Sequence, residues 1–310
     1  GISRVYFNPG RDDVKSPWQY VTIGISPDVE DAVLVDLDGD GSKDVVSASE
    51  GEAMRINFHW APSPGNSYAD SSLWKTEILP VSEGLMQWMF TVPVQIDGEH
   101  GIDLIAGGKR DNEKYPQPYI GWLKSPENPR DLAAWEWKPL AEVTWVMSII
   151  SADINSDGYA DIIFTERKGA RPGVKWLENP GADLETESWK FHHIGDTTIT
   201  VLFMTMDDLD NDGQQDIIVI TENEGVLFIQ KVAHDGSQWR THKISFPDNT
   251  GDRGKAVTVA DINGDGKKDL VLSFEKAEEP RSGVVYLTYE HSVFDLVWQR
   301  HEVSGAPGIK

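Results

Sequence analysis

The feature that most constrains this chain is a short acidic string that recurs at a nearly regular spacing. The string DLDGDGSKDVV begins at Asp36, and close variants begin at Asp153, Asp208 and Asp261. A degenerate copy, QIDGEHGIDLI, begins at Gln95. The copies are therefore 53 to 59 residues apart. Repeats of this length indicate that each copy forms one structural unit and that the units pack on one another.

Each intact copy offers the ligands that calcium prefers. Side-chain oxygens stand at positions 1, 3, 5 and 9, and calcium takes six to eight oxygen ligands. A Gly at position 6 permits a turn with positive φ, and the residue at position 7 offers its carbonyl. The alternative for any one copy is an acidic turn without an ion, but four intact copies favour calcium. The predicted calcium ligands are Asp36, Asp38, Asp40, Ser42, Asp44, Asp153, Asn155, Asp157, Tyr159, Asp161, Asp208, Asp210, Asp212, Gln214, Asp216, Asp261, Asn263, Asp265, Lys267 and Asp269.

The surroundings of the loops indicate strands and not the helices of an EF-hand. An EF-hand loop needs a Glu at position 12 and a helix on either side. Position 12 here is Ser47, Phe164, Val219 or Leu272. Each loop is followed by a β-branched run such as VVSAS or IIVIT, which is typical of strands. The sequence therefore predicts a hairpin in which two strands are joined by a calcium loop.

Two further strands complete each repeat. We name the strands before and after the loop A and B. Strand C has the pattern GVKWLENPG, as at residues 173–181, and strand D begins at a Trp, as at Trp189. Four-stranded units of this length predict an all-β fold, a β-propeller of four-stranded antiparallel blades. Five complete blades are expected at about 31–79, 88–140, 146–194, 201–244 and 256–303, and residues 1–23 match only strands C and D of a partial blade.

These loops and strands resemble the FG-GAP/VCBS repeat, which builds the propeller of integrin α-subunits. The resemblance implies one propeller domain over residues 1–310, and a seven-bladed ring in the full protein. Residues 305–310 stand where a further strand A would begin, and the matching A–B hairpin would lie outside this chain. The copy at Gln95 departs from the pattern, since Glu99 replaces the third Asp and His100 the Gly. We therefore predict that this copy binds no calcium.

Composition narrows the range of functions that this chain can have. The formal charge is −23, of which fourteen carboxylates belong to the intact loops, and this acidity argues against nucleic acid as a partner. Cys is absent, which excludes thiol catalysis and Cys-ligated zinc. No apolar run approaches the ~18 residues of a membrane span. Because weak calcium loops fill where calcium is abundant, we expect an extracytoplasmic location.

The resemblance also predicts a ligand-binding face. In this family the calcium loops lie on one face, and the B–C loops and D-to-A connections lie on the other. The residue six positions beyond the ninth loop residue is charged in all five copies, and we expect these five residues to point toward a shared opening. We also expect Lys109 and Arg167 to be exposed, so that their removal would leave stability unchanged. The candidate ligand-binding residues are Glu50, Lys109, Arg110, Arg167, Lys168, Glu222, Glu275, Trp88 and Trp145, with Lys276 and Phe203 beside them.

Two simpler readings compete with that face. B–C loops are generally solvated, so charges are common there, and Trp88 and Trp145 can pack in the core. His192, His242 and His301 share one place in strand D, which favours a structural role.

Three functions remain open. The leading one is recognition of a glycan or an extracellular protein by the B–C loop face. The second is a polysaccharide lyase or glycoside hydrolase, in which Arg167 or Lys109 neutralises a uronate and a carboxylate or Tyr115 moves the proton. The third is a structural module of a larger adhesin.

Overall fold

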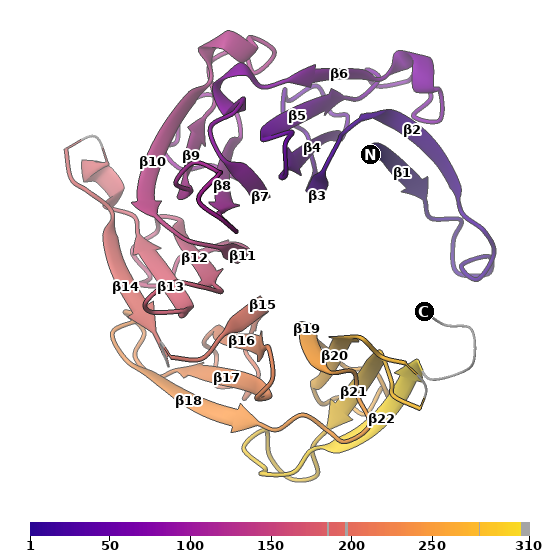
Figure 1. The fold of residues 1–310 in the computed structure, drawn as a ribbon, viewed down its shortest axis with the longest axis vertical. Helices are drawn as coiled ribbons and strands as arrows, with labels where there is room; N and C mark the ends of the chain where they lie inside the picture. Colours follow the sequence, from indigo (N-terminus) through magenta and orange to yellow (C-terminus); the bar gives the residue numbers. More distant parts are fainter. Residues whose placement is uncertain (185, 196–197, 279, 305–310) are drawn as a thin grey trace. The chain divides into compact units, whose positions relative to one another are not determined.

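The repeats fold into one sheet each. The structure, a computed structural model, describes residues 1–184, 186–195, 198–278 and 280–304 (Figure 1). It contains five four-stranded antiparallel sheets, in each of which the strands pair in chain order, and one two-stranded sheet. The predicted fold class, a β-propeller of four-stranded antiparallel blades, is confirmed. The number of blades in a full ring stays a prediction, and residues 305–310 lie outside the described residues.

The strands agree with the predicted A–B–C–D order. The two-stranded sheet comprises β1 (Ile2–Phe7) and β2 (Gln19–Ile25). The first two blades comprise β3 (Val29–Val35), β4 (Asp44–Ser49), β5 (Arg55–Trp60) and β6 (Lys75–Ile78), then β7 (Gln87–Val94), β8 (Asp103–Lys109), β9 (Tyr119–Lys124) and β10 (Glu136–Glu142). The third and fourth comprise β11 (Val146–Ala152), β12 (Asp161–Glu166), β13 (Gly173–Glu178) and β14 (Lys190–Ile194), then β15 (Val201–Asp207), β16 (Asp216–Thr221), β17 (Val226–Lys231) and β18 (Trp239–Ile244). The fifth comprises β19 (Arg253–Ala260), β20 (Asp269–Glu275), β21 (Val284–Thr288) and β22 (Gln299–Ser304).

The chain forms two compact units, residues 1–149 and residues 150–310. Each has its own core. In the first, Phe58, Trp60, Trp88 and Trp135 belong to one buried cluster. In the second, Trp176 packs with the aliphatic residues of β12, β16 and β17. A single domain over the whole chain stays a prediction.

Strand B is buried along its whole length in three of the blades. All six residues of β4 and of β16, and all seven of β8, are buried. A strand with neighbours on both edges and packing on both faces needs apolar residues at successive positions, and not the alternation of a half-exposed strand. This explains why the sequence of strand B is a continuous run rich in β-branched residues.

The two-stranded sheet packs against the first blade. The Thr76 hydroxyl donates to the Ile23 carbonyl at 2.9 Å, which joins β6 to β2. The approach is close at Gly24, where an added Cβ would lie 1.9 Å from Thr76 Oγ1. Val21 and Ile23 bury their side chains with Trp74 in a small cluster.

Helical structure among the described residues consists of four 3₁₀ turns: η1 (Ser71–Leu73), η2 (Pro80–Ser82), η3 (Leu132–Ala134) and η4 (Gly181–Asp183). No described helix has the length and apolar character required to cross a bilayer.

Candidate metal centres and ligand-binding face

The five acidic loops connect strands A and B, and the ninth residue of each loop is the first residue of strand B. In the intact copies the carboxylate at position 1 accepts from the backbone N–H of the Gly at position 6, at 2.9–3.0 Å. That Gly has a φ of +83° to +93°, which confirms the turn predicted there. Position 4 also has positive φ in every copy, at Gly39, Gly98, Ser156, Asn211 and Gly264.

Two loops gather three carboxylates around a common point. Carboxylate oxygens of Asp36, Asp38 and Asp40 lie within 4.8 Å of one another, and so do those of Asp208, Asp210 and Asp216. In the first loop, the Oδ1 atom of Asp36 is buried and has no hydrogen-bond partner among the described residues. A buried carboxylate oxygen without a donor is costly unless a cation compensates it. These two loops therefore fit a hard divalent cation.

The loops at Asp153 and Asp261 have an amide at position 3. The side-chain N–H of Asn155 donates to Asp157 at 2.8 Å, and that of Asn263 donates to Asp265 at 3.1 Å. The amide oxygen of each Asn accepts from the backbone N–H at position 5. The donors remain hard oxygens but carry one negative charge fewer. We expect these two loops to bind calcium more weakly.

The ninth residue has a structural role that the sequence analysis missed. One carboxylate oxygen of Asp216 accepts from the N–H of Leu209 at 3.2 Å, and the other accepts from the N–H of Lys231 at 2.9 Å. The carboxylate thus ties the loop to the end of strand C. Asp44, Asp103 and Asp161 make the equivalent pair of bonds. The sequence could have signalled this role, because the degenerate copy retains this Asp.

Burial raises the pKa of these carboxyls. It raises the pKa of Asp44 and Asp161 to about 6, against the lowering effect of the backbone donors. It raises the pKa of Asp216 to about 7, where the charges of Asp210 and Asp212 add to the effect. A bound divalent cation would favour the ionised form and reverse this shift.

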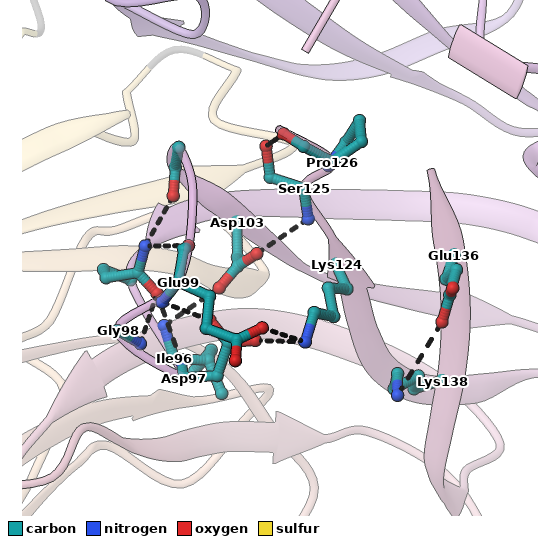
Figure 2. A network of polar contacts seen from close by, with 12 residues as sticks. Ile96, Asp97, Gly98, Glu99, Asp103, Lys124, Ser125, Pro126, Glu136 and Lys138 are labelled. Atoms are coloured by element: carbon teal, nitrogen blue, oxygen red, sulfur yellow. Dashed lines mark hydrogen bonds and ion pairs between the residues drawn. The ribbon is translucent and has the colours of Figure 1, made fainter. Parts of the chain in front are cut away.

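The degenerate loop contains an internal cation (Figure 2). The Lys124 Nζ atom lies 2.6 Å from Asp97 Oδ2 and 2.9 Å from Glu99 Oε2. Burial lowers the pKa of Lys124, but the two ion pairs outweigh it and raise the pKa above its usual value. His100 stands where the other copies have Gly and still has a φ of +53°. Sequence reasoning missed Lys124 because it lies on strand C, outside the repeated string.

The predicted binding residues lie at the other end of strand B. In the first unit, Glu50 and Lys109 form an ion pair, and Lys109 Nζ lies 4.5 Å from the centroid of the Trp145 ring. Lys109 is only 8% exposed. The expectation that Lys109 is exposed is therefore wrong, because its ammonium is enclosed by a carboxylate and an indole.

In the second unit the equivalent residues form a larger network. Arg167 pairs with Glu222 at 3.1 Å, and Arg253 links Glu222 at 3.0 Å to Glu275 at 3.4 Å. Lys255 also pairs with Glu275, at 3.0 Å, and this contact contributes most to a lowered pKa of Glu275. Arg253 and Lys255 lie on strand A and were not predicted. Within each unit, the charged residues predicted at the end of strand B are thus brought together as ion pairs.

The remaining candidates differ in exposure. Trp88 is fully buried, packs edge-on against Trp137 at 5.1 Å, and donates its indole N–H to Ser82. Trp88 is therefore a core residue, in agreement with the alternative interpretation given above. Trp145 is half-buried, and Lys168 is exposed.

Arg110 lines a cavity of about 230 Å³ at the B–C loop of the second blade. Its guanidinium donates to Gln117 at 3.3 Å and lies 3.9 Å from the Glu113 carboxylate. Both contacts are at the long end of their range, and the Arg110 side chain is 32% exposed.

The strand D histidines have structural surroundings. His192 stacks on Trp176 with ring centroids 4.1 Å apart and pairs with Glu178 at 2.6 Å. His301 stacks on Tyr286 at 4.5 Å. His242 packs against Phe228 at 5.5 Å. Each covers an aromatic residue of strand C, which confirms the structural reading.

Comparison with known proteins agrees with the repeat pattern. Residues 208–272 match the FG-GAP-like repeat family. The chain contains an FG-GAP-like repeat. Among solved structures, it is similar to an engineered GH43 glycoside hydrolase with endo-xylanase and exo-arabinofuranosidase activity, at 13% identity and a TM-score of 0.37. The match covers 91% of this chain and 53% of that one, so the chain spans about half the length of that enzyme. No curated protein sequence matches.

Proposed function

We propose that this chain is an extracytoplasmic calcium-binding module that recognises a polar ligand, a glycan or an extracellular protein, through its B–C loops. The intact loops support the calcium part of the proposal. Their carboxylates converge in the copies at Asp36 and Asp208, and the matched FG-GAP-like repeat includes the loops at Asp208 and Asp261.

The residues that would hold calcium are those at positions 1, 3, 5 and 9 of each intact loop, with the carbonyl of position 7. Bound calcium would supply positive charge that neutralises the loop carboxylates. The loop residues themselves fix the turn between strands A and B, and the ninth Asp attaches this turn to strand C. The role is therefore structural, and the loops hold the blade in the shape that presents the opposite loops.

The recognition part of the proposal rests on the contacts of the Arg110 side chain. Lys109 and Arg167 are engaged in short ion pairs, whereas the side-chain contacts of Arg110 with the described residues are long and lie at the edge of its cavity. A half-exposed guanidinium can donate two parallel hydrogen bonds to a carboxylate or sulfate. The cavity of about 230 Å³ is smaller than a typical small-molecule pocket, so it suits one charged group of a larger ligand.

A glycan array probed in calcium tests the proposal. We expect binding to acidic glycans, and we expect Arg110→Ala to weaken it at least about tenfold, the loss of about 1.4 kcal/mol. Arg11→Ala is the matched control, because Arg11 is exposed in the β1–β2 loop of the same unit. Equal binding by both variants would refute the role of Arg110.

The enzyme and adhesin-module hypotheses stay predictions. The Tyr115 hydroxyl donates to Glu52 at 3.1 Å on the surface of the first unit. A product assay on acidic polysaccharides tests the enzyme hypothesis directly.

A further inference from the structure

The degenerate loop at residues 95–103 is closed by a protein cation. Lys124 contacts Asp97 and Glu99, which are the residues at loop positions 3 and 5 (Figure 2). These are two of the positions whose carboxylates converge in the intact loop at Asp36. The side chains of Lys124 and Asp97 are 18% and 7% exposed, so this ion pair is largely removed from water, whereas the Glu99 side chain is 60% exposed.

Gln95 satisfies the rest of the loop without a metal. Its amide oxygen accepts from the N–H groups of Asp97 at 3.1 Å and Gly98 at 2.9 Å. Its amide nitrogen donates to the carbonyls of Glu99 at 2.9 Å and Gly101 at 2.5 Å. A carboxylate at position 1 can only accept, whereas an amide also donates. The replacement therefore turns two loop carbonyls toward a protein donor, and one of them, that of Gly101, is the position 7 carbonyl expected to bind metal in the intact loops.

The position of Lys124 has a defined counterpart in the intact loop at Asp208. Leu104 pairs with Leu123, and Ile217 pairs with Ile229, so Lys124 and Gln230 are equivalent. The Gln230 side-chain N–H donates to the position 3 carboxylate of its own loop, Asp210, at 2.6 Å. The same place on strand C thus contacts the same loop position, with a charge in one blade and a neutral amide in the other. The corresponding residues of the other blades are Trp60, Glu178 and Thr288.

We propose that the Lys124 ammonium takes the place of a calcium ion in the loop at residues 95–103. The second blade is then stable without metal, while the intact loops depend on it. The comparison with those loops rests on the proposed calcium binding. The effect of Lys124 on its own loop does not, so the two ideas can fail separately.

The first experiment measures thermal unfolding in excess chelator. Lys124→Gln should lower the melting temperature by about 3–6 °C, on the scale of about 2–4 °C per kcal/mol for a unit of this size. Lys124→Arg, which keeps the charge, should recover at least half of this loss. Lys138→Gln is the matched control, because Lys138 lies on the adjacent strand β10 with its Nζ atom 3.8 Å from Glu136. That variant should shift the melting temperature by less than about 1 °C. An equal shift in Lys124→Gln and Lys138→Gln would overturn the proposal.

The second experiment makes the reciprocal change. Gln230→Lys should place an ammonium against Asp210 and reduce the calcium bound per chain by one ion, measured by native mass spectrometry. Retention of the full calcium complement by Gln230→Lys would overturn the equivalence of the ammonium and the ion. A wild-type chain that binds no calcium would refute the proposed function, and the unfolding experiment would still decide the role of Lys124.

Discussion

Protonation of His59 should destabilise the first unit in mild acid. His59 lies on β5 and is fully buried. Its Nε2 atom is 2.9 Å from the Ser47 hydroxyl and 3.2 Å from the Ser26 hydroxyl, and its Nδ1 atom is 2.7 Å from the Thr76 hydroxyl. Burial lowers the pKa of His59 to about 4, because it disfavours the charged imidazolium.

The sign and size follow from the difference between the folded and unfolded states. The unfolded pKa is about 6.5, so the unfolded chain binds the proton first as the pH falls. The contribution of neutral His59 to stability is therefore complete above about pH 6.5 and is lost as the pH falls toward 4. The full difference is about 3.4 kcal/mol, and the part lost between pH 7 and pH 5 is about 1.8 kcal/mol, at about 1.36 kcal/mol per pKa unit.

Urea unfolding followed by Trp fluorescence, in excess chelator at pH 7 and pH 5, measures this loss. We compare wild type with His59→Gln, whose amide keeps hydrogen-bonding capacity but does not titrate. The buried Asp carboxyls titrate alike in both proteins, so they cancel in the comparison. The wild type should lose about 1.8 kcal/mol more than the variant between the two pH values. A difference below about 0.5 kcal/mol would refute the argument from burial.

Three further predictions concern the charged groups. Lys109→Ala should lower the free energy of unfolding by about 2–4 kcal/mol, because it leaves a partly buried carboxylate unpaired, whereas the exposed Lys15→Ala should change it by less than about 0.5 kcal/mol in the same denaturant titration. Arg253→Ala should destabilise the second unit in urea, because Arg253 joins the carboxylates of Glu222 and Glu275; a change below about 0.5 kcal/mol would contradict this. Asp208→Asn should abolish one calcium site, and each filled site should contribute about 2.7 kcal/mol at a calcium concentration of 100 times its dissociation constant, which chelator titration of the melting temperature measures.

The sequence predicted the blades well because the same pattern of strands and loop occurs five times. Every strand B begins at the ninth loop residue, as at Asp44 and Asp216, and the apolar runs of β4 and β16 match strands whose residues are all buried. The position 6 glycines were also predictable, since Gly adopts positive φ at the lowest cost.

The sequence did not predict the partners of the charged residues. Lys124, Arg253 and Lys255 lie on strands C and A, and their contacts depend on register and on side-chain direction between strands far apart in the chain. Lys109 was expected to be exposed because loops usually are, but Trp145 covers it. Because the charged residues share one position in each repeat, the sequence predicted that they lie close together. It did not show that residues of opposite charge would form ion pairs.

The number of calcium ions bound per chain tests the central claim most directly. Native mass spectrometry of the intact chain, after dialysis against calcium and then against a volatile buffer, counts them. The account predicts four ions, one for each loop that begins at Asp36, Asp153, Asp208 and Asp261, and none for the loop at Gln95. A chain that carries no calcium, or that carries a fifth ion lost on Gln95→Ala, would contradict it.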